Sequence, residues 1–413
     1  MLHGTSSTVI FGSRTMRTCV IVLASISAVF LVMQVTWTNV NVRNSLNQIS
    51  RFSFLDNFET KVIVEDPPCL DRLATKFNRV EDIFCLNLPK FLPELKNPCF
   101  YEYVLNNKRR LRCLPYFYII GMDKSGSTDL HGRLAKHPLV YGNLGSMDKE
   151  TQFWSWNRYG FMNKRKGELK ATLDMYMDLF SHTAEIIDSH NDTHIITGDA
   201  TPMDLWDFRG WTMIPQNQGL EEPWILTPHF LRYIHKGAPK LLIQFREPVE
   251  RLYSDYIFLN YGKDPIEFHK HAIQAIDMMH SCFRNHSKRY CYLDDTLYQK
   301  LPARIHLGCY SMFLKEWFQV FPRSAFHVTR TTEYTNNMAE TLDGVFKFLD
   351  IPSVSSELMA DILNQTRRHV TSLKHGVVLP ETRVALRSFY EECNRETAML
   401  LEDDRFLWLD HYS

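Results

Sequence analysis

Short apolar runs alternate with helical stretches through most of the chain. The runs are rich in aromatic and β-branched residues, as the strands of a buried sheet are. They occupy residues 116–121, 194–198, 241–245 and 325–329. Helical stretches occupy residues 129–137, 169–180, 266–279 and 384–401, and a further helix begins at Pro248. Strands separated by helices predict an α/β fold, with a parallel sheet as the middle of three layers.

The N-terminus has a different pattern. Residues 19–35 form an unbroken stretch of apolar and small residues, preceded by Arg14 and Arg17 with no acidic residue nearby. Its length is at the lower edge of the roughly 17–25 residues that cross a bilayer, and the basic flank predicts a cytoplasmic N-terminus. A cleaved signal peptide is the alternative, although the segment lacks a clear small-x-small cleavage site.

These patterns predict the organisation of the whole chain. We expect a cytoplasmic tail at residues 1–17, a transmembrane signal-anchor at 18–36 and a lumenal remainder. Residues 37–98 have few long periodic patterns and many prolines and asparagines, which predicts a stem passing into an irregular N-terminal subdomain. The main folded domain should then occupy residues 99–413.

A loop that contains glycine follows the first apolar run. Gly126 would let the backbone approach an anion, and the N–H groups of Ser127 and Thr128 would open a helix whose dipole favours negative charge. The common nucleotide loop is G-x-x-x-x-G-K-[ST], but here Lys124 comes before the glycine, separated from it by Ser125. The loop predicts a nucleotide-type cofactor, and an ordinary strand-to-helix turn is the alternative.

A second anion-binding element follows the run at residues 241–245. Arg246 stands at the end of this strand, and Pro248 suits the first turn of a helix on which Ser254 lies about two turns further along. An arginine fork and a hydroxyl group predict a phosphate site, whereas a solvated arginine at a helix start is the alternative. Ligands of parallel sheets bind at the carboxyl ends of the strands, so both elements can meet on one cofactor.

These elements resemble those of the Golgi carbohydrate sulfotransferases, most closely the branch that contains N-acetylgalactosamine 4-sulfate 6-O-sulfotransferase. In sulfotransferases, a 5′-phosphosulfate loop with its lysine at the position of Lys124 holds 3′-phosphoadenosine-5′-phosphosulfate (PAPS). An R-x-P-x-x-R-x-x-S element, spaced as Arg246 to Ser254 are here, grips the 3′-phosphate. The resemblance extends from about Cys99 to the C-terminus, and its closest stretches are residues 111–121, 149–154, 198–206 and 379–383, with Phe389 and Tyr390.

The resemblance implies a sulfotransferase fold with a P-loop-like core and PAPS as co-substrate. The residues implied in cofactor binding are Lys124, Ser125, Gly126, Ser127, Thr128, Arg246, Ser254 and Lys374. Glu150 matches the catalytic glutamate of heparan-type sulfotransferases and would be the general base, while Lys124 would neutralise charge on the departing 3′,5′-diphosphoadenosine. Asp199, Trp206 and the segment around Lys374 would shape the acceptor cleft or close over the cofactor.

The implied acceptor is a glycosaminoglycan, with the 6-hydroxyl of N-acetylgalactosamine (4-sulfate) in chondroitin or dermatan sulfate as the target. The implied compartment is the Golgi, with a single-pass type II anchor. A homodimer is left open and no nucleic-acid partner is expected. One departure concerns the loop, because Met122 and Asp123 stand where relatives usually carry an uncharged pair. An aspartate that pointed inward there would weaken anion binding.

Composition agrees with a folded enzyme that binds anions locally. The chain has 413 residues, 45% of them hydrophobic, and a formal net charge of zero. A polyanionic ligand must therefore meet local basic clusters rather than a global field. Candidates are the runs at residues 108–112, 164–166 and 367–369, although such runs are usually solvated faces.

Cysteines and glycosylation sequons support a lumenal domain. Of nine cysteines, Cys19 lies in the apolar span and eight remain, an even set that suits disulfides in an oxidising compartment. Cys282 and Cys291 are close in sequence and are the safest pair. No motif has the spacing of a zinc site, so no metal is expected. Acceptor sequons begin at Asn191, Asn285 and Asn364.

Three other classes of protein share some of these features. A nucleotide-dependent kinase would explain the Lys124 loop, but the lysine is misplaced for that motif. A Golgi glycosyltransferase would share the membrane topology, but the chain has no Asp-x-Asp pair for a metal and a nucleotide sugar. A sulfotransferase acting on another glycan, or an inactive glycan-binding relative, would keep all the polar groups and is separated only by assay.

Overall fold

The computed structural model describes residues 66–103, 108–162, 170–366 and 376–411. All of them belong to the second of two compact units of the chain, Thr60–Ser413. The predicted tail, the apolar span, most of the stem and Lys374 lie outside the described residues, and what was predicted for them stays a prediction. Within the described ranges, no helix is both long and apolar enough to cross a bilayer.

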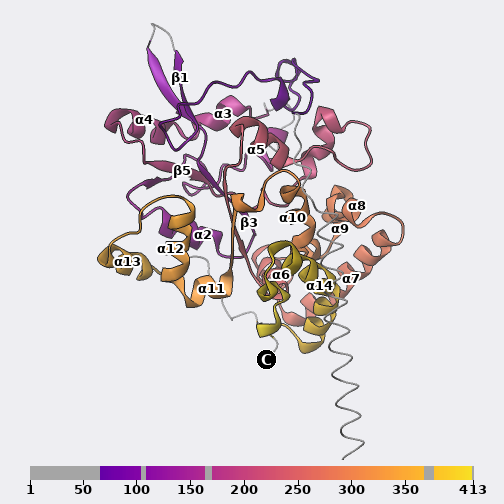
Figure 1. Ribbon diagram of the computed structural model, residues 1–413. Helices are drawn as coiled ribbons and strands as arrows, with labels where there is room; N and C mark the ends of the chain where they lie inside the picture. Colours follow the sequence, from indigo (N-terminus) through magenta and orange to yellow (C-terminus); the bar gives the residue numbers. More distant parts are fainter. Residues whose placement is uncertain (1–65, 104–107, 163–169, 367–375, 412–413) are drawn as a thin grey trace, which may run out of the picture. The chain divides into compact units, whose positions relative to one another are not determined.

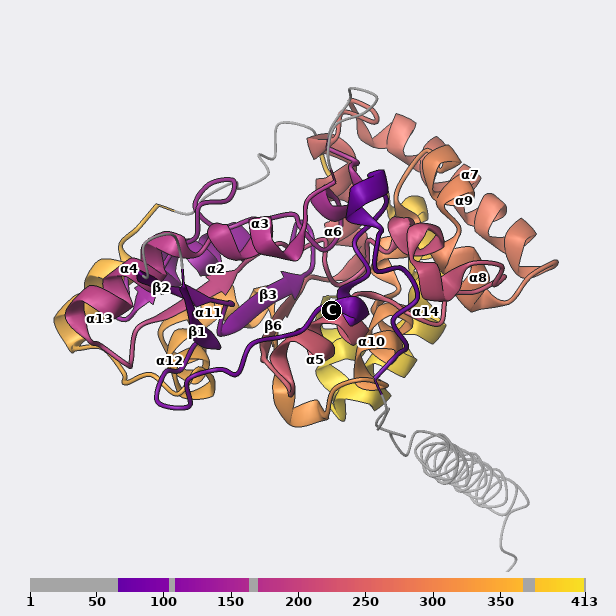
Figure 2. The ribbon, with the colours of Figure 1, turned by 90° about the horizontal axis from the view of Figure 1, so that it is seen from above.

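A five-stranded parallel sheet is the centre of the described part. Its strands lie in the order β4 (Val140–Tyr141), β5 (Ile196–Asp199), β3 (Phe117–Gly121), β6 (Lys240–Phe245) and β7 (Phe326–Arg330). All neighbouring strands are parallel, and β3 and β6 run side by side at the middle (Figure 2). The predicted α/β fold and parallel sheet are confirmed, since each of the four predicted runs overlaps a strand. The short edge strand β4 was not predicted.

Helices cover both faces of the sheet, because the side chains of β3 alternate between two apolar clusters. Phe117 and Ile119 pack with α2, α12 and α13, whereas Tyr118 and Ile120 pack with α5, α6, α10 and α14. Figure 1 shows α2 and α11 to α13 on one side of the strands, and α6, α10 and α14 on the other. The predicted three layers are therefore confirmed.

The helices fall into two groups, one on each face of the sheet. The first face carries α2 (Ser127–Leu134), α11 (Thr331–Asn336), α12 (Met338–Phe348) and α13 (Ser356–Leu363). The second cluster is built from α3 (Leu173–Asp178), α5 (Thr227–His235), α6 (Pro248–Phe258), α7 (Pro265–Phe283), α8 (Lys288–Leu293), α10 (Tyr310–Phe318) and α14 (Pro380–Leu401), with α9 (Asp295–Lys300) beside them.

The helix predicted at residues 169–180 is present but shorter. Within these bounds the chain forms α3, and a separate helix, α4 (Ser181–His190), follows it. Thr172 fixes the start of α3, because its side chain accepts a hydrogen bond from the N–H of Met175. Phe180 is not in helical geometry, so α4 begins only after it. The helix α4 was not predicted.

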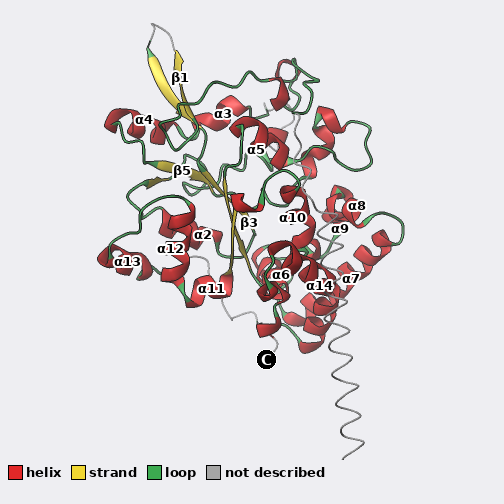
Figure 3. Ribbon diagram, in the orientation of Figure 1, coloured by secondary structure: helices red, strands yellow, loops and turns green. Residues whose placement is uncertain are grey.

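An antiparallel hairpin of β1 (Cys99–Tyr103) and β2 (Arg109–Cys113) forms a separate sheet that was not predicted (Figure 3). Three arginines in β2 obscure its alternation. One of them, Arg112, is buried and pairs with Asp174 and Asp178. It therefore serves the fold, which corrects its assignment to a polyanion-binding cluster. The runs at 164–166 and 367–369 lie outside the described residues.

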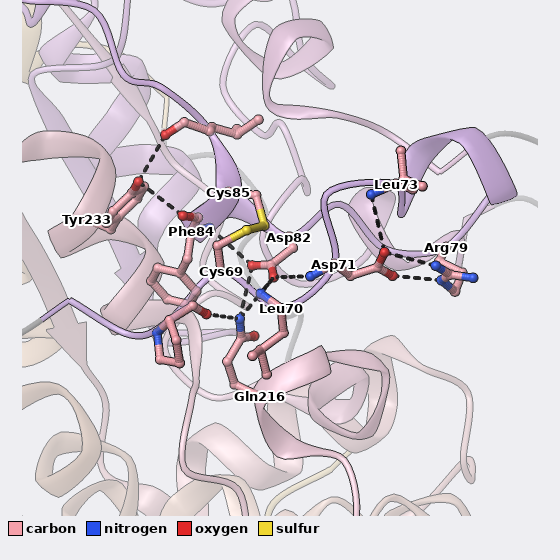
Figure 4. Close-up of a disulfide and its surroundings, with 12 residues drawn as sticks. Cys69, Leu70, Asp71, Leu73, Arg79, Asp82, Phe84, Cys85, Gln216 and Tyr233 are labelled. Atoms are coloured by element: carbon pink, nitrogen blue, oxygen red, sulfur yellow. Dashed lines mark hydrogen bonds and ion pairs between the residues drawn. A yellow bond between two sulfur atoms is a disulfide. The ribbon is translucent and has the colours of Figure 1, made fainter.

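Four disulfides cross-link the described part of the chain. They are Cys69–Cys85, Cys99–Cys113, Cys282–Cys291 and Cys309–Cys393. The even cysteine set and the predicted Cys282–Cys291 pair are confirmed. Beside the first disulfide, the buried carboxylate of Asp82 accepts hydrogen bonds from the N–H groups of Leu70 and Asp71 and from the amide of Gln216 (Figure 4).

Candidate active site

A cavity of about 670 Å³ lies at the carboxyl ends of β3, β6 and β7. It is lined by residues that directly follow these three strands and by the loop that carries Glu150. Every described residue that the sequence assigned to cofactor binding or catalysis lines it: Lys124, Ser125, Gly126, Ser127, Thr128, Glu150, Arg246 and Ser254. The structure thus brings together groups separated by up to 130 positions in the chain.

The loop from β3 to α2 is held in a shape that exposes its backbone. Lys124 and Gly126 have positive φ angles of 64° and 101°, and the second value lies where a residue other than glycine is strained. Gly126 is the N-cap of α2, and within the described part no side chain caps this helix. Its first N–H groups are therefore available to an anion, which the helix dipole favours.

The side chain of Lys124 lies in the cavity. Its Nζ is 3.5 Å from the centre of the Phe258 ring, a cation–π contact. Burial lowers the pKa of Lys124, and the carboxylates of Asp255 and Asp123 act against this effect. Among the described residues no carboxylate forms an ion pair with Lys124, so its charge faces the cavity without a neutralising partner there.

Arg246 joins the two anion-binding elements. Its Nη1 donates to the backbone carbonyl of Lys124 at 3.4 Å, and its own carbonyl accepts a hydrogen bond of 2.6 Å from the Tyr310 hydroxyl. Glu250, one turn along α6, lies 3.7 Å from Arg246 and 2.6 Å from Arg383 of α14. The guanidinium is therefore held by the Lys124 carbonyl and by Glu250 while Arg246 still lines the cavity.

Helix α6 begins as predicted. Pro248 is its first residue, and the Glu247 side chain caps it by accepting from the N–H of Glu250 at 2.8 Å. Ser254 lies on the same helix, is buried and lines the cavity. The arginine between them, Arg251, is fully buried and pairs with Asp255, so it supports the helix and does not line the cavity.

Thr331 connects the ends of all three strands. It directly follows β7, and its hydroxyl lies 2.8 Å from the carbonyl of Ser125 and 3.1 Å from the carbonyl of Phe245. The sequence interpretation missed this residue. Its position one residue after a predicted strand, where ligands of parallel sheets bind, was the signal that could have identified it.

Glu150 lies in a loop between β4 and β5 and is largely buried, with 14% of its side chain exposed. Its Oε1 is 2.6 Å from Nζ of the buried Lys149, and its Oε2 accepts from the Gln152 amide at 3.3 Å. Asn143 holds the loop by donating to the carbonyls of Lys149 and Gly198 at 2.8 Å each. The carboxylate is thus oriented before any ligand arrives.

Comparison with known proteins gives the family. Residues 114–380 match the family described as the sulfotransferase domain. The chain belongs to this family. Carbohydrate sulfotransferase 15 from rat and from human are each 32% identical over 373 residues, which cover 77% of this chain and 66% of each relative. The chain therefore spans slightly less than two thirds of the length of these relatives.

Solved sulfotransferases are more distant. The crystal structure of a sulfotransferase from Alicyclobacillus acidocaldarius is 17% identical, with a TM-score of 0.41, and the match covers 70% of this chain and 97% of that one. This overlap adds nothing to the argument. Membership in the sulfotransferase family rests on the match over residues 114–380, which contains every cavity residue named above.

Two expectations about this sulfotransferase domain are wrong. Asp199 and Trp206 are buried and do not line the cavity. Asp199 accepts hydrogen bonds from the hydroxyls of Thr151 and Thr201 at 2.5 and 2.7 Å, and burial raises its pKa. It therefore holds the loop next to Glu150 through Thr151.

Two histidines near α2 lie outside the cavity lining. His131 and His137 are buried outside the cavity lining, and His137 Nε2 lies 2.9 Å from the carbonyl of Pro352. Lys374 lies outside the described residues. Apolar side chains also line the cavity, namely Met147, Trp156, Pro202, Met203 and Phe258.

Proposed function

We propose that this protein transfers a sulfuryl group from PAPS to a hydroxyl group of a glycosaminoglycan. The observation that carries the proposal is the meeting, in one cavity, of an uncapped helix start with Lys124, an arginine with Ser254, and the oriented carboxylate of Glu150. The family and the names of the curated relatives support the same reaction. The finer proposal, from the resemblance, is the 6-hydroxyl of N-acetylgalactosamine 4-sulfate in chondroitin or dermatan sulfate.

The residues present fit the donor. Gly126 leaves room for an anion above the start of α2, and Lys124 adds a positive charge that burial and the Phe258 ring keep in the cavity. In the proposal these groups hold the phosphosulfate end, while Arg246 and Ser254 bind the 3′-phosphate. PAPS supplies an activated sulfuryl group, so the protein has to position it and stabilise charge.

Glu150 is proposed to accept the proton of the attacking hydroxyl. A new oxygen–sulfur bond forms as the bond from sulfur to the phosphate oxygen breaks, and 3′,5′-diphosphoadenosine leaves. Lys149 and Gln152 hold the carboxylate in one orientation, as general-base catalysis requires. Lys124 faces the cavity without a carboxylate partner among the described residues and would stabilise the charge on the departing phosphate.

Activity assays test the reaction and the acceptor together. The purified full chain in detergent is incubated with labelled PAPS and a panel of desulfated and partly sulfated glycosaminoglycans, and the products are digested to disaccharides. We expect label on position 6 of N-acetylgalactosamine, with the 4-sulfated acceptor preferred. Lys124→Ala is the inactive control. Label on a different glycan would show that the proposed acceptor is wrong. Binding of glycans without any transfer would indicate that the protein is an inactive relative.

We also propose that the protein is a single-pass type II protein of the Golgi membrane. The apolar stretch at residues 19–35, the four disulfides and the exposure of all three sequon asparagines support this. Protease added outside sealed Golgi vesicles should leave the domain intact, and removal of N-glycans should lower its mass. A cytosolic product without glycans would contradict the proposal.

A further inference from the structure

Asp123 is out of place beside an anion site. It directly precedes Lys124, lines the cavity, and has only 12% of its side chain exposed. A carboxylate there repels a polyanion strongly, because the effective dielectric constant of a partly buried site is low. The inward orientation is the one that should weaken anion binding. The cavity therefore needs a group that cancels this charge.

Arg304 is that group. Its Nη2 lies 3.5 Å from Asp123 Oδ2, and its Nε donates to Asp255 Oδ2 at 2.7 Å. One guanidinium thus spans an acid next to Lys124, on the first anion-binding loop, and an acid next to Ser254, on α6. These two elements follow different strands, β3 and β6.

Arg304 is itself held in place. It comes from the irregular segment between α9 and the turn at Ile305–Gly308. Its guanidinium lies 5.3 Å from the centre of the Trp206 ring, and its carbonyl accepts from Arg251 Nη2 at 3.2 Å. The residue is buried yet reaches the cavity wall. This arrangement is rigid enough to fix the distance between two elements that approach the same ligand.

We propose that Arg304 is a positioning residue of the cofactor site, which joins the Lys124 loop to α6 and cancels the charge of Asp123. This inference rests on the proposed function, because the anion in question is the donor. Without Arg304, Asp255 keeps a partner in Arg251 at 3.3 Å. Asp123 then has no other ion pair among the described residues, and its nearest cation in sequence is Lys124. It would repel the donor and compete for the lysine.

The charge of Asp123 gives the proposal a pH signature. The groups that face it are Arg304, Asp255 and Arg251, with Glu150 across the cavity and Lys124 next to it in sequence. Burial raises the pKa of Asp123 to about 6, against the opposing effect of Arg304. With Arg304 in place, Asp123 is therefore mostly charged above about pH 6. Arg304 lowers this pKa, so without it Asp123 becomes charged only at a higher pH, and loss of Arg304 should harm anion binding mainly at the upper end of the pH range.

Titration calorimetry with 3′,5′-diphosphoadenosine tests this on the full chain in detergent, above and below about pH 6. The variants are Asp123→Asn, Arg304→Met and both together. Arg289→Met is the matched control, since it removes an arginine paired with Glu316 away from the cavity. Thermal unfolding of each variant checks the fold. If the unsubstituted chain does not bind the ligand at all, the proposed function fails.

We expect Arg304→Met to weaken binding well above pH 6 by roughly ten- to a hundredfold, the size of one lost charge-assisted contact. The loss should shrink as the pH falls and Asp123 becomes neutral, and Asp123→Asn should restore most of the binding in the double variant. Asp123→Asn alone should bind at least as tightly as the unsubstituted chain, and this arm stands even if Arg304→Met fails to fold. An equal loss at both pH values without rescue, or weaker binding in Asp123→Asn, would overturn the inference while the donor assignment stands.

Discussion

The carboxylate of Glu150 lies between two donors from its own loop. Lys149 is almost fully buried, so water hardly competes with Glu150 Oε1 for its ammonium group. Gln152 contacts the other oxygen at 3.3 Å. A base fixed in this way needs little reorganisation before proton transfer, which is how a positioned group gains its catalytic effect.

Replacing Glu150 by glutamine separates catalysis from binding. Glu150→Gln keeps the shape of the side chain but removes the base, so turnover should fall by about 10²–10⁴-fold. Affinity for 3′,5′-diphosphoadenosine should hardly change. A labelled-sulfate assay beside calorimetric titration measures both. Glu185→Gln, an exposed change on α4, is the control. Near-normal turnover in Glu150→Gln would move the base to another residue.

Arg246 should determine which nucleotide binds. The 3′-phosphate distinguishes 3′,5′-diphosphoadenosine from AMP, and the unsubstituted protein should prefer the former. Arg246→Ala should largely remove this preference, because one lost charge-assisted contact costs roughly 1.5–3 kcal/mol. Competition binding with the two nucleotides checks this, with the exposed Arg284→Ala as control. A variant that still discriminates as well as the unsubstituted protein would show that another group reads the 3′-phosphate.

At the scale of elements, three strand ends build the cavity and one hydroxyl group links them. Thr331 follows β7 and contacts the carbonyls of Ser125 and Phe245, the first in the Lys124 loop and the second at the end of β6. A hydroxyl has a single proton, so it shares this proton between the two carbonyls. The link holds the Lys124 loop and the end of β6 together at the edge of the cavity.

Thr331→Val should loosen this junction while keeping the size and branching of the side chain. We expect the free energy of unfolding to fall by about 0.5–1.5 kcal/mol, as for one lost hydrogen bond, and affinity for 3′,5′-diphosphoadenosine to fall with it. Thr331→Ser should restore both, since serine keeps the hydroxyl group. Denaturant unfolding and calorimetry measure the two effects. If serine and valine behave alike, the methyl group rather than the hydroxyl group is what matters.

The elements also show what a sequence can predict. The four buried runs, the turn of α6 at Pro248 and the anion-binding loop each have a local pattern, so they could be predicted together with the residues at their ends. The hairpin β1 and β2 could not, because its buried Arg112 is neutralised by Asp174 and Asp178, which are far away in sequence. The same holds for Arg304, whose role depends on Asp123 and Asp255 and on no motif around it.

On the scale of the whole molecule, disulfides join segments that are distant in sequence. Cys309–Cys393 connects the start of α10 to the middle of α14 across 84 positions, whereas Cys282–Cys291 closes only 9. Cross-linking restricts the unfolded chain more when the closed loop is longer. The Cys309–Cys393 disulfide should therefore contribute more to stability than Cys282–Cys291.

Replacing both members of each pair by serine tests this difference. The Cys309→Ser and Cys393→Ser double variant should lose about 2–4 kcal/mol of unfolding free energy, and the Cys282→Ser and Cys291→Ser double variant should lose less. Denaturant unfolding under non-reducing conditions measures both. An equal or larger loss for the shorter loop would indicate that local packing, rather than loop length, sets the contribution of each bond.

Helix α14 also sets where the domain can be cut. The region shared with the family ends at residue 380, the residue at which α14 begins. Beyond it lie Arg383, which holds Glu250 beside Arg246, and Tyr390, whose hydroxyl donates to the carbonyl of Ile305 at 2.8 Å. A shortened protein that stops at the family boundary would keep every residue proposed to touch the donor. It would nevertheless lack the scaffold that aims them, so recombinant versions need to extend through residue 411.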